Sequence, residues 1–194
     1  MTTDWNKVLD YLEPRESPHC PEDASLTQKV FLRTYSLEAL FGGAAGGGKS
    51  SALLMAALQY VDVPQYSAIL FRRTYADLAL PGAIMDRFQM WTGPEEDVKW
   101  NANTYTATFP SGARISFGYL NNSQDYLRYK GAEFQFIGMD EVTEIREADY
   151  RYLFSRLRRP ASGPLSKVPL RMRCASNPAP NWVRQRFIIE GQNE

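Results

Sequence analysis

The sequence predicts an α/β fold with a mostly parallel central sheet flanked by helices. Three observations point to it: strand-length apolar runs alternate with helical stretches, a glycine-rich turn follows the first run, and a later run ends in two acids. Strands covered by helices on both faces have this near-continuous apolar character. At 194 residues, the chain has the length of one domain that can bury its own core.

Residues 1–24 are interpreted as an arm and residues 25–194 as the domain. A short helix is expected over Asp4–Leu12, followed by a Pro-rich connector over Pro14–Pro21. The amino end shows no basic leader followed by an apolar stretch, and no segment is long and apolar enough to span a membrane.

The first half of the domain alternates helices and strands. Ser25 is a candidate N-cap for a helix over Leu26–Thr34. The expected elements that follow are a strand over Leu37–Phe41, an Ala-, Leu- and Met-rich helix over Lys49–Val61, a strand over Ser67–Arg72 and a helix over Pro81–Trp91. Proline is tolerated in the first turn of that last helix, where its missing N–H has no partner to lose.

The second half begins with alternating apolar and polar residues that predict a hairpin. Its strands are Thr104–Phe109 and Ala113–Tyr119, around Pro110–Gly112. The later elements are a strand over Phe134–Met139, a helix over Glu147–Leu157 with Arg156, Arg158 and Arg159 crowded at its carboxyl end, a loop over Pro160–Pro169 and a strand over Leu170–Ala175.

Composition narrows the possible chemistry. Lys and Arg number 22, as do Asp and Glu, so the net charge is zero, which argues against nucleic-acid binding through bulk charge but leaves a local basic face open. Cys20 and Cys174 lie far apart, which disfavours a disulfide framework and favours a reducing, intracellular setting. A zinc site would need both cysteines, His19 and a carboxylate, and a Ser-His-Asp hydrolase would need His19 as its base, so both are disfavoured.

Residues 43–50, Gly-Ala-Ala-Gly-Gly-Gly-Lys-Ser, match the phosphate-binding pattern G-x-x-x-x-G-K-[ST], between a predicted strand and a predicted helix. Small residues let backbone N–H groups turn toward a polyphosphate, and the following helix points its positive end at the same anion. Lys49 would contact the β- and γ-phosphates, and Ser50 would supply a hydroxyl ligand to Mg²⁺. The alternative is a flexible linker or a plain strand-to-helix turn. Five glycines within residues 42–48 disfavour it, because glycine loses more conformational entropy on folding than other residues.

The run Phe134–Met139 ends in Asp140 and Glu141, the form of a Walker B strand. Asp140 would position Mg²⁺, and Glu141 would act as the general base that activates water. A second acid is not needed for metal binding, so its presence favours hydrolysis over transfer to an acceptor. Glu144 and Glu147 are interpreted as the exposed start of the next helix.

Asn177 lies in Ser176-Asn177-Pro178, after the last strand. Its side chain would touch the γ-phosphate or the attacking water, and the alternative is a plain Asn-Pro turn.

Taken in order, these residues resemble the ATPase domain of phage large terminase subunits, the motors that pump DNA into procapsids. The resemblance covers roughly residues 25–189. It is carried by Ala39–Ser50, Phe71–Thr74 with Leu78 behind it, Tyr129–Phe134 leading into Asp140 and Glu141, Ser155–Arg158, Ala175–Pro178 and Trp182–Arg184. The two Walker motifs alone are common to additional-strand, RecA-like P-loop ATPases, and the ordered set is more specific.

The resemblance implies roles that the residues by themselves do not show. Gln28 corresponds to the adenine-contacting glutamine of a Q motif, and Asn177 lies in the coupling motif that links hydrolysis to movement. The implied nucleotide-binding residues are Gln28, Gly43, Ala44, Ala45, Gly46, Gly47, Gly48, Lys49, Ser50 and Ser51, with Ser50 and Asp140 as magnesium ligands. ATP and Mg²⁺ are the implied substrate and cofactor.

The resemblance also implies partners and a place of action. Such motors work as a pentameric ring on the portal protein of the procapsid, with double-stranded DNA through the centre, and with a small terminase subunit. The resemblance implies that the motor acts in the host cytoplasm, at the portal of the procapsid. It implies no membrane partner, and the motor is not expected in the mature virion. A basic residue of the neighbouring subunit completes each site.

Three departures from the family pattern stand out. Ala44 and Ala45 replace an arginine that many terminases carry early in the loop. Lys130 replaces the arginine that often serves as the trans-acting finger, which leaves Arg128, Lys130, Arg156 and Arg158 as candidates. No carboxylate cluster for a nuclease follows residue 189. We therefore expect no nuclease activity from this chain, and we expect the chain to be a piece of a longer protein.

Other functions are weighed against this one. A helicase-like translocase of the same ATPase division would need further motifs and a second domain. A nucleotide-binding module without hydrolysis is disfavoured by Lys49, Asp140 and Glu141, and a small-molecule kinase by Glu141. Arg72-Arg73 and the arginines at 156, 158 and 159 are interpreted more readily as solvated surface than as DNA contacts.

Overall fold

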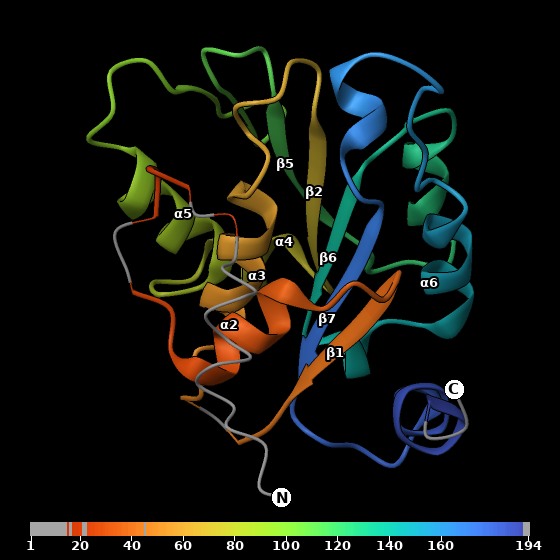
Figure 1. The fold of residues 1–194 in the computed structure, drawn as a ribbon. Helices are drawn as coiled ribbons and strands as arrows, with labels where there is room; N and C mark the ends of the chain where they lie inside the picture. The colour runs from red at the N-terminus through yellow and green to blue at the C-terminus, as the bar shows by residue number, and fades with distance from the viewer. Residues whose placement is uncertain (1–14, 16, 21–22, 45, 192–194) are drawn as a thin grey trace, which may run out of the picture.

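A sheet of mainly parallel strands forms the centre of the structure, a computed structural model that describes residues 15, 17–20, 23–44 and 46–191 (Figure 1). Within these residues the sheet has seven strands in the order β1-β7-β6-β2-β5-β4-β3. The strands are β1 (Glu38–Gly42), β2 (Ser67–Arg72), β3 (Lys99–Asn101), β4 (Thr106–Thr108), β5 (Arg114–Tyr119), β6 (Phe136–Asp140) and β7 (Arg171–Ser176). The first five in spatial order run parallel, and β4 and β3 continue the sheet as antiparallel strands.

The strand order confirms the predicted fold class. Strand β7 lies between β1, which leads into the glycine loop, and β6, which ends in the acidic pair. One additional strand therefore separates the two Walker elements, which is the arrangement of additional-strand P-loop folds. Because all three strands are parallel, their carboxyl ends meet at one edge of the sheet, where Gly42 pairs with Ser176 and Asp140 with Ala175.

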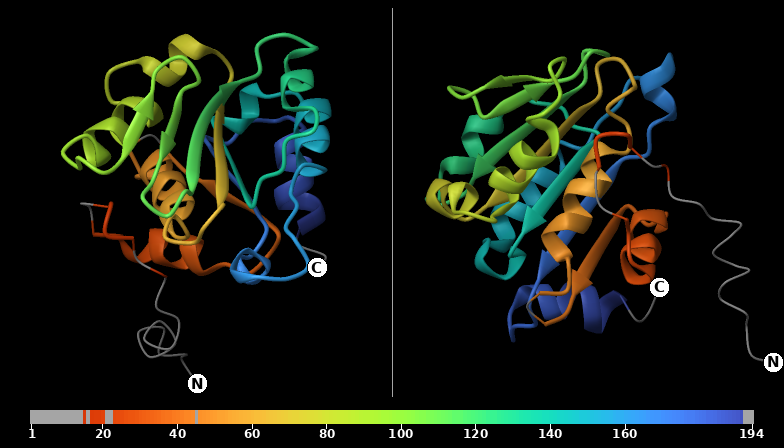
Figure 2. Two further views of the ribbon diagram at one scale, coloured as in Figure 1. Left: turned by 90° about the horizontal axis from the view of Figure 1, so that it is seen from above. Right: turned by 90° about the vertical axis from the view of Figure 1, so that its left-hand side faces the viewer.

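Helices cover both faces of the sheet, as the two views of Figure 2 show. One face carries α2 (Leu26–Arg33), α3 (Lys49–Leu58), α4 (Tyr75–Ala79) and α5 (Ile84–Thr92). The other carries η1 (Asp125–Tyr129), η2 (Val142–Glu144), α6 (Glu147–Phe154), α7 (Trp182–Arg184) and η4 (Gln185–Glu190). The buried apolar side chains accordingly form two clusters, one under each layer.

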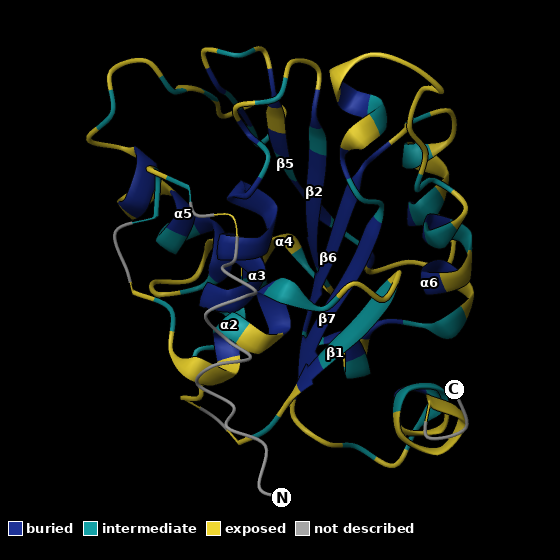
Figure 3. Ribbon diagram, in the orientation of Figure 1, coloured by how far each residue is buried: buried dark blue, intermediate teal, exposed yellow. Residues whose placement is uncertain are grey.

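Helix α3 is buried at every position except Ser50, which is intermediate, and it is mostly dark blue in Figure 3. Its alanines allow close approach to the sheet, and residues 52–58 are at most 5% exposed. A helix buried on all sides is apolar all round, which explains the run of Ala, Leu and Met. Its amino end is thereby fixed against the sheet edge that carries the acidic pair.

Two buried arginines of β7 hold α2 and the segment after it. Arg173 is fully buried, and its guanidinium donates to the carbonyls of Thr34 (2.6 Å) and Ser36 (3.0 Å). Arg171 donates to the Leu32 carbonyl (3.2 Å) and to Gln59 Oε1 (2.7 Å). Burial lowers the pKa of Arg173 to about 10, so the side chain remains a cation at neutral pH. These bonds satisfy carbonyls at the end of α2 that have no helical partner.

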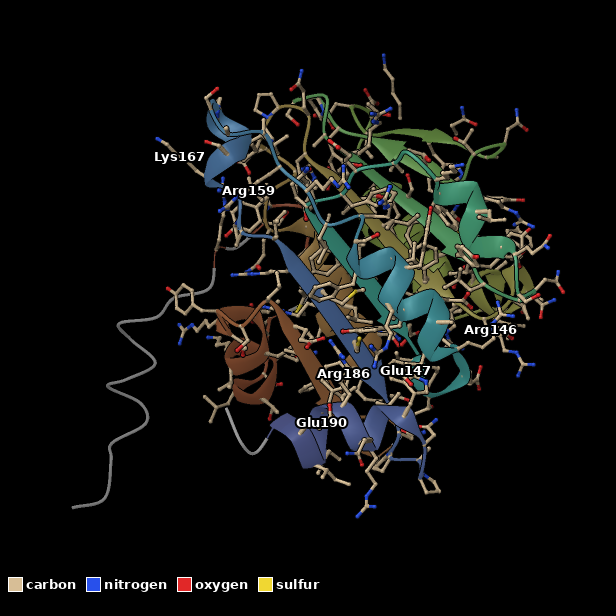
Figure 4. All side chains as sticks on the ribbon, turned by 90° about the vertical axis from the view of Figure 1, so that its right-hand side faces the viewer. Arg146, Glu147, Arg159, Lys167, Arg186 and Glu190 are labelled. Atoms are coloured by element: carbon tan, nitrogen blue, oxygen red, sulfur yellow. The ribbon has the colours of Figure 1, made fainter. Side chains whose placement is uncertain are left out.

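The carboxyl-terminal helical segment is tied to β1 by one ion pair. The guanidinium of Arg186 donates two bonds of 2.9 Å to the Glu38 carboxylate, the geometry in which arginine binds carboxylates most specifically. Figure 4 shows Arg186 and Glu190 at one end of the sheet, with Arg159 and Lys167 at the opposite end, on and next to η3 (Pro164–Lys167). No helix in the described part of the chain is long and apolar enough to cross a bilayer.

Most of the predicted elements are confirmed, including the N-cap of α2, the 104–119 hairpin and all the parallel strands. The helix expected over Pro81–Trp91 begins only at Ile84, because Pro81 and Gly82 (φ +77°) form a turn and Ala83 is extended. The helix expected over Lys49–Val61 ends at Leu58. The predicted helix over Asp4–Leu12, parts of the 14–21 connector and Ala45 lie outside the described residues.

The helix expected over Glu147–Leu157 ends at Phe154, so the prediction that Arg156, Arg158 and Arg159 crowd a helix end is wrong. After a turn at residues 155–156, the chain pairs with residue 134 instead: Phe134 N–H donates to the Arg156 carbonyl and Arg158 N–H to the Phe134 carbonyl, both at 3.0 Å. This pairing gives the Arg156 carbonyl and the Arg158 N–H partners outside the helix. The short α4, β3 and the helical segment over 182–190 were not predicted.

A close packing contact around Gly118 gives a test of the fold. A Cβ added to Gly118 would lie 2.5 Å from Tyr129 Oη and 2.7 Å from the ring of Phe71. We expect Gly118→Ala to lower the free energy of unfolding by about 2 kcal/mol, because overpacking forces neighbouring side chains off their preferred positions. Urea titration measures the effect. Tyr129→Phe removes one of the clashing atoms and should recover part of the loss in the double variant, whereas strictly additive effects would contradict the contact.

Candidate nucleotide-binding site

The glycine loop lies between β1 and α3, and its backbone requires glycine. Gly46 (φ +81°) and Gly48 (φ +69°) adopt left-handed conformations that residues with a Cβ rarely take. A Cβ on Gly48 would also lie 2.6 Å from Nε2 of Gln28. The sequence pattern and the local geometry therefore agree on a tight turn that leads into the amino end of α3.

Gln28 braces this loop from α2. Its side chain is 7% exposed, its Nε2 donates to the Gly48 carbonyl (2.9 Å), and its Oε1 accepts from Ser25 N–H (2.9 Å). The second bond belongs to the capping box that begins α2. Both halves of the amide are thus engaged within the protein, and the adenine contact that the resemblance implies stays a prediction.

The side chains of Lys49 and Asn177 are in contact, although 128 positions separate them in the sequence. Lys49 Nζ donates to Asn177 Oδ1 (2.9 Å) and to the carbonyls of Ala44 (2.8 Å) and Gly43 (3.2 Å). The side chain is 8% exposed, so these oxygens replace water around the ammonium group. The structure therefore connects the glycine loop directly to the end of β7.

Asp140 is held by a cation and a hydroxyl. Its carboxylate is 1% exposed, accepts from Ser50 Oγ at 3.0 and 3.2 Å, and pairs with Arg72 Nε at 2.8 Å. Burial raises the pKa of Asp140, and the Arg72 guanidinium and the Ser50 hydroxyl oppose that rise. Arg72 stands at the end of β2, next to β6, so it belongs to the site and is not a solvated surface residue. Its neighbour Arg73 is exposed.

Glu141 occupies an uncommon backbone conformation directly after β6. Its φ of 50° and ψ of 51° are left-handed, which turns the chain sharply away from the strand. The side-chain Oε2 accepts from Ser176 Oγ (3.1 Å), and this hydroxyl also contacts Thr143 Oγ1 (2.6 Å). Ser176 ends β7, so the additional strand orients the second acid.

Several of these groups line one cleft of about 250 Å³. The residues that line it are Gly46, Gly47, Gly48, Lys49, Ser50, Ser51, Arg87, Glu141 and Asn177. Ser51 is 1% exposed and accepts a hydrogen bond from the guanidinium of Arg87 on α5. An apolar cavity of about 300 Å³ adjoins it on the side of β7 and α7 and shares Asn177 with it.

The oxygens present suit a magnesium ion. Mg²⁺ prefers hydroxyl and carboxylate oxygens and usually keeps water and substrate phosphates as further ligands. Ser50 and Asp140 offer such oxygens side by side, next to the glycine loop. Among the described residues, no group of three His, Cys, Asp or Glu side chains forms a self-sufficient metal site, so phosphate oxygens would have to complete the coordination.

The four candidates for the finger lie away from this cleft. Arg128 pairs with Asp125 (3.0 Å) and stacks on Tyr119, Arg156 lies over Tyr152, and Arg158 is 3.6 Å from Glu133. For Lys130, which is exposed, the described part of the chain offers no side-chain partner. Arg158 and Arg159 line a polar groove of about 620 Å³ at the amino-terminal edge of the sheet, opposite the glycine loop.

Three contributors were missed by sequence reasoning. Arg72 could have been found, because it ends a strand that neighbours the acidic strand in a parallel sheet. Ser176 was noted only as a neighbour of Asn177. Arg87 left no signal, because it lies in the middle of a helix without a motif around it.

The fold and the site together define an additional-strand P-loop protein with a nucleotide-binding cleft. More narrowly, the chain belongs to the family of terminase large subunits of the T4likevirus type, amino-terminal part, whose pattern matches residues 40–162. No curated protein matches the chain.

Several solved structures share the fold. The large terminase of bacteriophage HK97 superposes with a TM-score of 0.66 at 12% identity, covering 97% of this chain and 40% of that one. The large terminase of a thermophilic bacteriophage gives 0.61 at 14% identity, covering 99% and 43%. The ATPase domain of the Thermus phage P74-26 large terminase gives 0.57 at 14% identity, covering 88% and 73%. This chain thus spans about two fifths of the first two of these proteins.

The Arg72–Asp140 pair gives a test of the site. We expect Arg72→Gln to lower the free energy of unfolding by about 3 kcal/mol near neutral pH, because it leaves a buried carboxylate without its cation. Burial already raises the pKa of Asp140, and losing Arg72 raises it further. When an acid has a higher pKa in the folded than in the unfolded protein, the free energy of unfolding falls as the pH rises from the unfolded-state pKa to the folded-state pKa. The loss of stability in Arg72→Gln should therefore grow from acidic to neutral pH. Urea titrations across that range measure it.

Asp140→Asn removes the charge that needs Arg72, so the double variant should regain most of the lost stability. Arg73→Gln is the matched control, because Arg73 is exposed. An equal loss in the control, or a loss in Arg72→Gln that does not vary with pH, would contradict the pairing.

Proposed function

We propose that this chain binds and hydrolyses ATP and is the motor domain of a terminase that moves double-stranded DNA into procapsids. The observation that carries the proposal is the convergence of Lys49, Glu141 and Asn177 around one cleft, with Asp140 bonded to the cleft residue Ser50, in a chain of the large-terminase family. The large terminase of the thermophilic bacteriophage has been solved in complex with ATP-gamma-S and with ADP, which supports nucleotide binding by the shared fold.

Binding would begin with the polyphosphate on the glycine loop. Backbone N–H groups of the loop and the amino end of α3 would donate to the phosphate oxygens. Lys49 would exchange its contacts with the Gly43 and Ala44 carbonyls for phosphate oxygens, which are stronger acceptors because they carry charge. Ser50 and Asp140 would hold Mg²⁺, which supplies neutralisation of charge on the phosphates when bound.

Hydrolysis would depend on Glu141 as the general base. Its carboxylate would accept a proton from the water that attacks the γ-phosphate. Ser176 holds that carboxylate at 3.1 Å, and the left-handed backbone aims it from the end of β6 into the cleft. Such a fixed orientation removes most of the entropy cost of aligning base and water.

Asn177 would report the state of the nucleotide. Its bond to Lys49 joins the segment after β7 to the group that contacts the β- and γ-phosphates. When Lys49 engages a γ-phosphate, Asn177 loses or changes this partner, and release of phosphate restores it. The segment that leads from Asn177 to α7 is therefore the path along which hydrolysis would be coupled to movement.

The remaining machinery would come from an assembly. A basic residue of a neighbouring subunit would complete each site in a pentameric ring, with Arg128, Lys130, Arg156 or Arg158 as the finger. Lys130 is the candidate best placed to reach a neighbour, because it is exposed and the described residues leave it unpaired. Double-stranded DNA, the portal protein and procapsid, and a small terminase subunit would be the partners, in the host cytoplasm.

Glu141→Gln tests the assignment of the base. We expect ATP turnover to fall by at least about 100-fold, the usual contribution of a general base, while the affinity for ATP-gamma-S changes little. Phosphate release and calorimetric binding measure the two quantities. Glu144→Gln is the matched control, because Glu144 is an exposed acid three residues further on. Unchanged turnover in Glu141→Gln would show that the assigned base is wrong.

The packaging role has a separate test. Phosphate release by the chain is compared alone, with double-stranded DNA, and with DNA and procapsids together. Strong stimulation by the complete mixture supports the packaging motor, and Lys49→Ala should abolish it because the phosphates lose their main cation. Stimulation by DNA alone together with separation of a forked duplex would favour the helicase-like alternative.

A further inference from the structure

Arg87 reaches the nucleotide cleft from a helix that belongs to neither Walker motif. It lies on α5, whose Ile84, Phe88 and Trp91 are buried in the core and fix the helix against the sheet and α3. Arg87 lies one turn from Ile84 and from Trp91, at the border of this buried face. Its guanidinium donates to Ser51 Oγ in the first turn of α3 and lines the cleft together with the glycine loop.

The charge of Arg87 is not balanced by a carboxylate. The side chain is half-buried, and no ion pair joins it to any acid in the described part of the chain. The adjacent Asp86 is engaged elsewhere, since its carboxylate accepts from the backbone N–H of Gly82 (2.7 Å). A guanidinium carries five N–H donors, and a single serine hydroxyl leaves most of them available for another acceptor.

The cleft has a surplus of positive charge that suits a polyanion. Asp140 and Arg72 do not line the cleft, and their charges neutralise each other. Of the described residues that line the cleft, Glu141 is the only acid, against Lys49 and Arg87. Lys49 is already bonded to three protein oxygens, so Arg87 is the cation with the most unused hydrogen-bonding capacity.

The contact with Ser51 indicates which phosphates Arg87 would meet. Lys49 and Ser50 serve the β- and γ-phosphates and the metal, and Glu141 and Asn177 stand on the hydrolytic side. Ser51 is the next residue along α3, and Arg87 approaches it from α5 on the layer opposite to η2 and α7. Arg87 is thereby placed toward the α- and β-phosphates.

We propose that Arg87 is a phosphate-binding residue that contacts the α- and β-phosphates of the nucleotide bound by its own chain. This inference rests on the proposed function and adds to it a second cation beside Lys49, supplied by α5 and not by the glycine loop. Its consequence is specific: Arg87 strengthens the binding of ADP as much as that of ATP.

Calorimetric affinities for ADP and for ATP-gamma-S test the proposal. We expect Arg87→Gln to weaken both by about tenfold or more, the size expected for a lost hydrogen bond to a charged group. Arg87→Lys keeps the charge without the planar fork and should lose less. Arg114→Gln is the matched control, because Arg114 is exposed at the opposite end of the sheet. Circular dichroism establishes whether the variants are folded. If Arg87→Gln does not fold, the affinities of Arg87→Lys test the proposal instead.

Two results would overturn the proposal. Affinities within about twofold of the wild type for both nucleotides would mean that Arg87 only supports Ser51. A loss confined to ATP-gamma-S would place Arg87 at the γ-phosphate instead. If the unaltered chain bound neither nucleotide, the proposed function would fail first, so the two failures are distinguishable.

Discussion

The buried carboxylate of Asp140 is the constraint on which the site depends. A group that is 1% exposed at the end of β6 needs partners, and it finds them in Ser50 of the glycine-loop helix and Arg72 of the adjacent strand. Three elements are thereby fixed relative to one another: β6, β2 and the amino end of α3. The glycine loop owes its position over the sheet edge to this contact and to the packing of α3.

The additional strand gives the site its second half. Because β7 lies between β1 and β6, its end delivers Ser176 to Glu141 and Asn177 to Lys49. The layer of α2, α3 and α5 therefore brings Lys49, Ser51 and Arg87 to the cleft, and the ends of β6 and β7 bring Glu141 and Asn177.

Much of the fold and of the site could be predicted from local signals. The glycine pattern, the acidic pair and the apolar runs are contiguous in sequence, and each requires particular residue types. Helix ends were less predictable, because the pairing of residues 156–158 with Phe134 overrides the helical pattern that precedes them. The roles of Arg72 and Arg87 did not follow from local pattern, because a guanidinium on a long side chain acts where the tertiary structure carries it.

By itself, the sequence determined the class of fold, the phosphate-binding loop, and the identities of the candidate metal-binding acid and base, because each rests on short-range chemistry that only certain residues provide. The tertiary structure alone decided that Gln28 braces Gly48, that Arg72 neutralises Asp140, and that Lys49 touches Asn177 across 128 positions. The net charge of zero does not show how the charges are distributed. In the structure, Arg72 and Asp140 form a buried pair, and the cleft carries more positive than negative side chains. Charge balance at a site depends on distance and burial, and neither is written in composition.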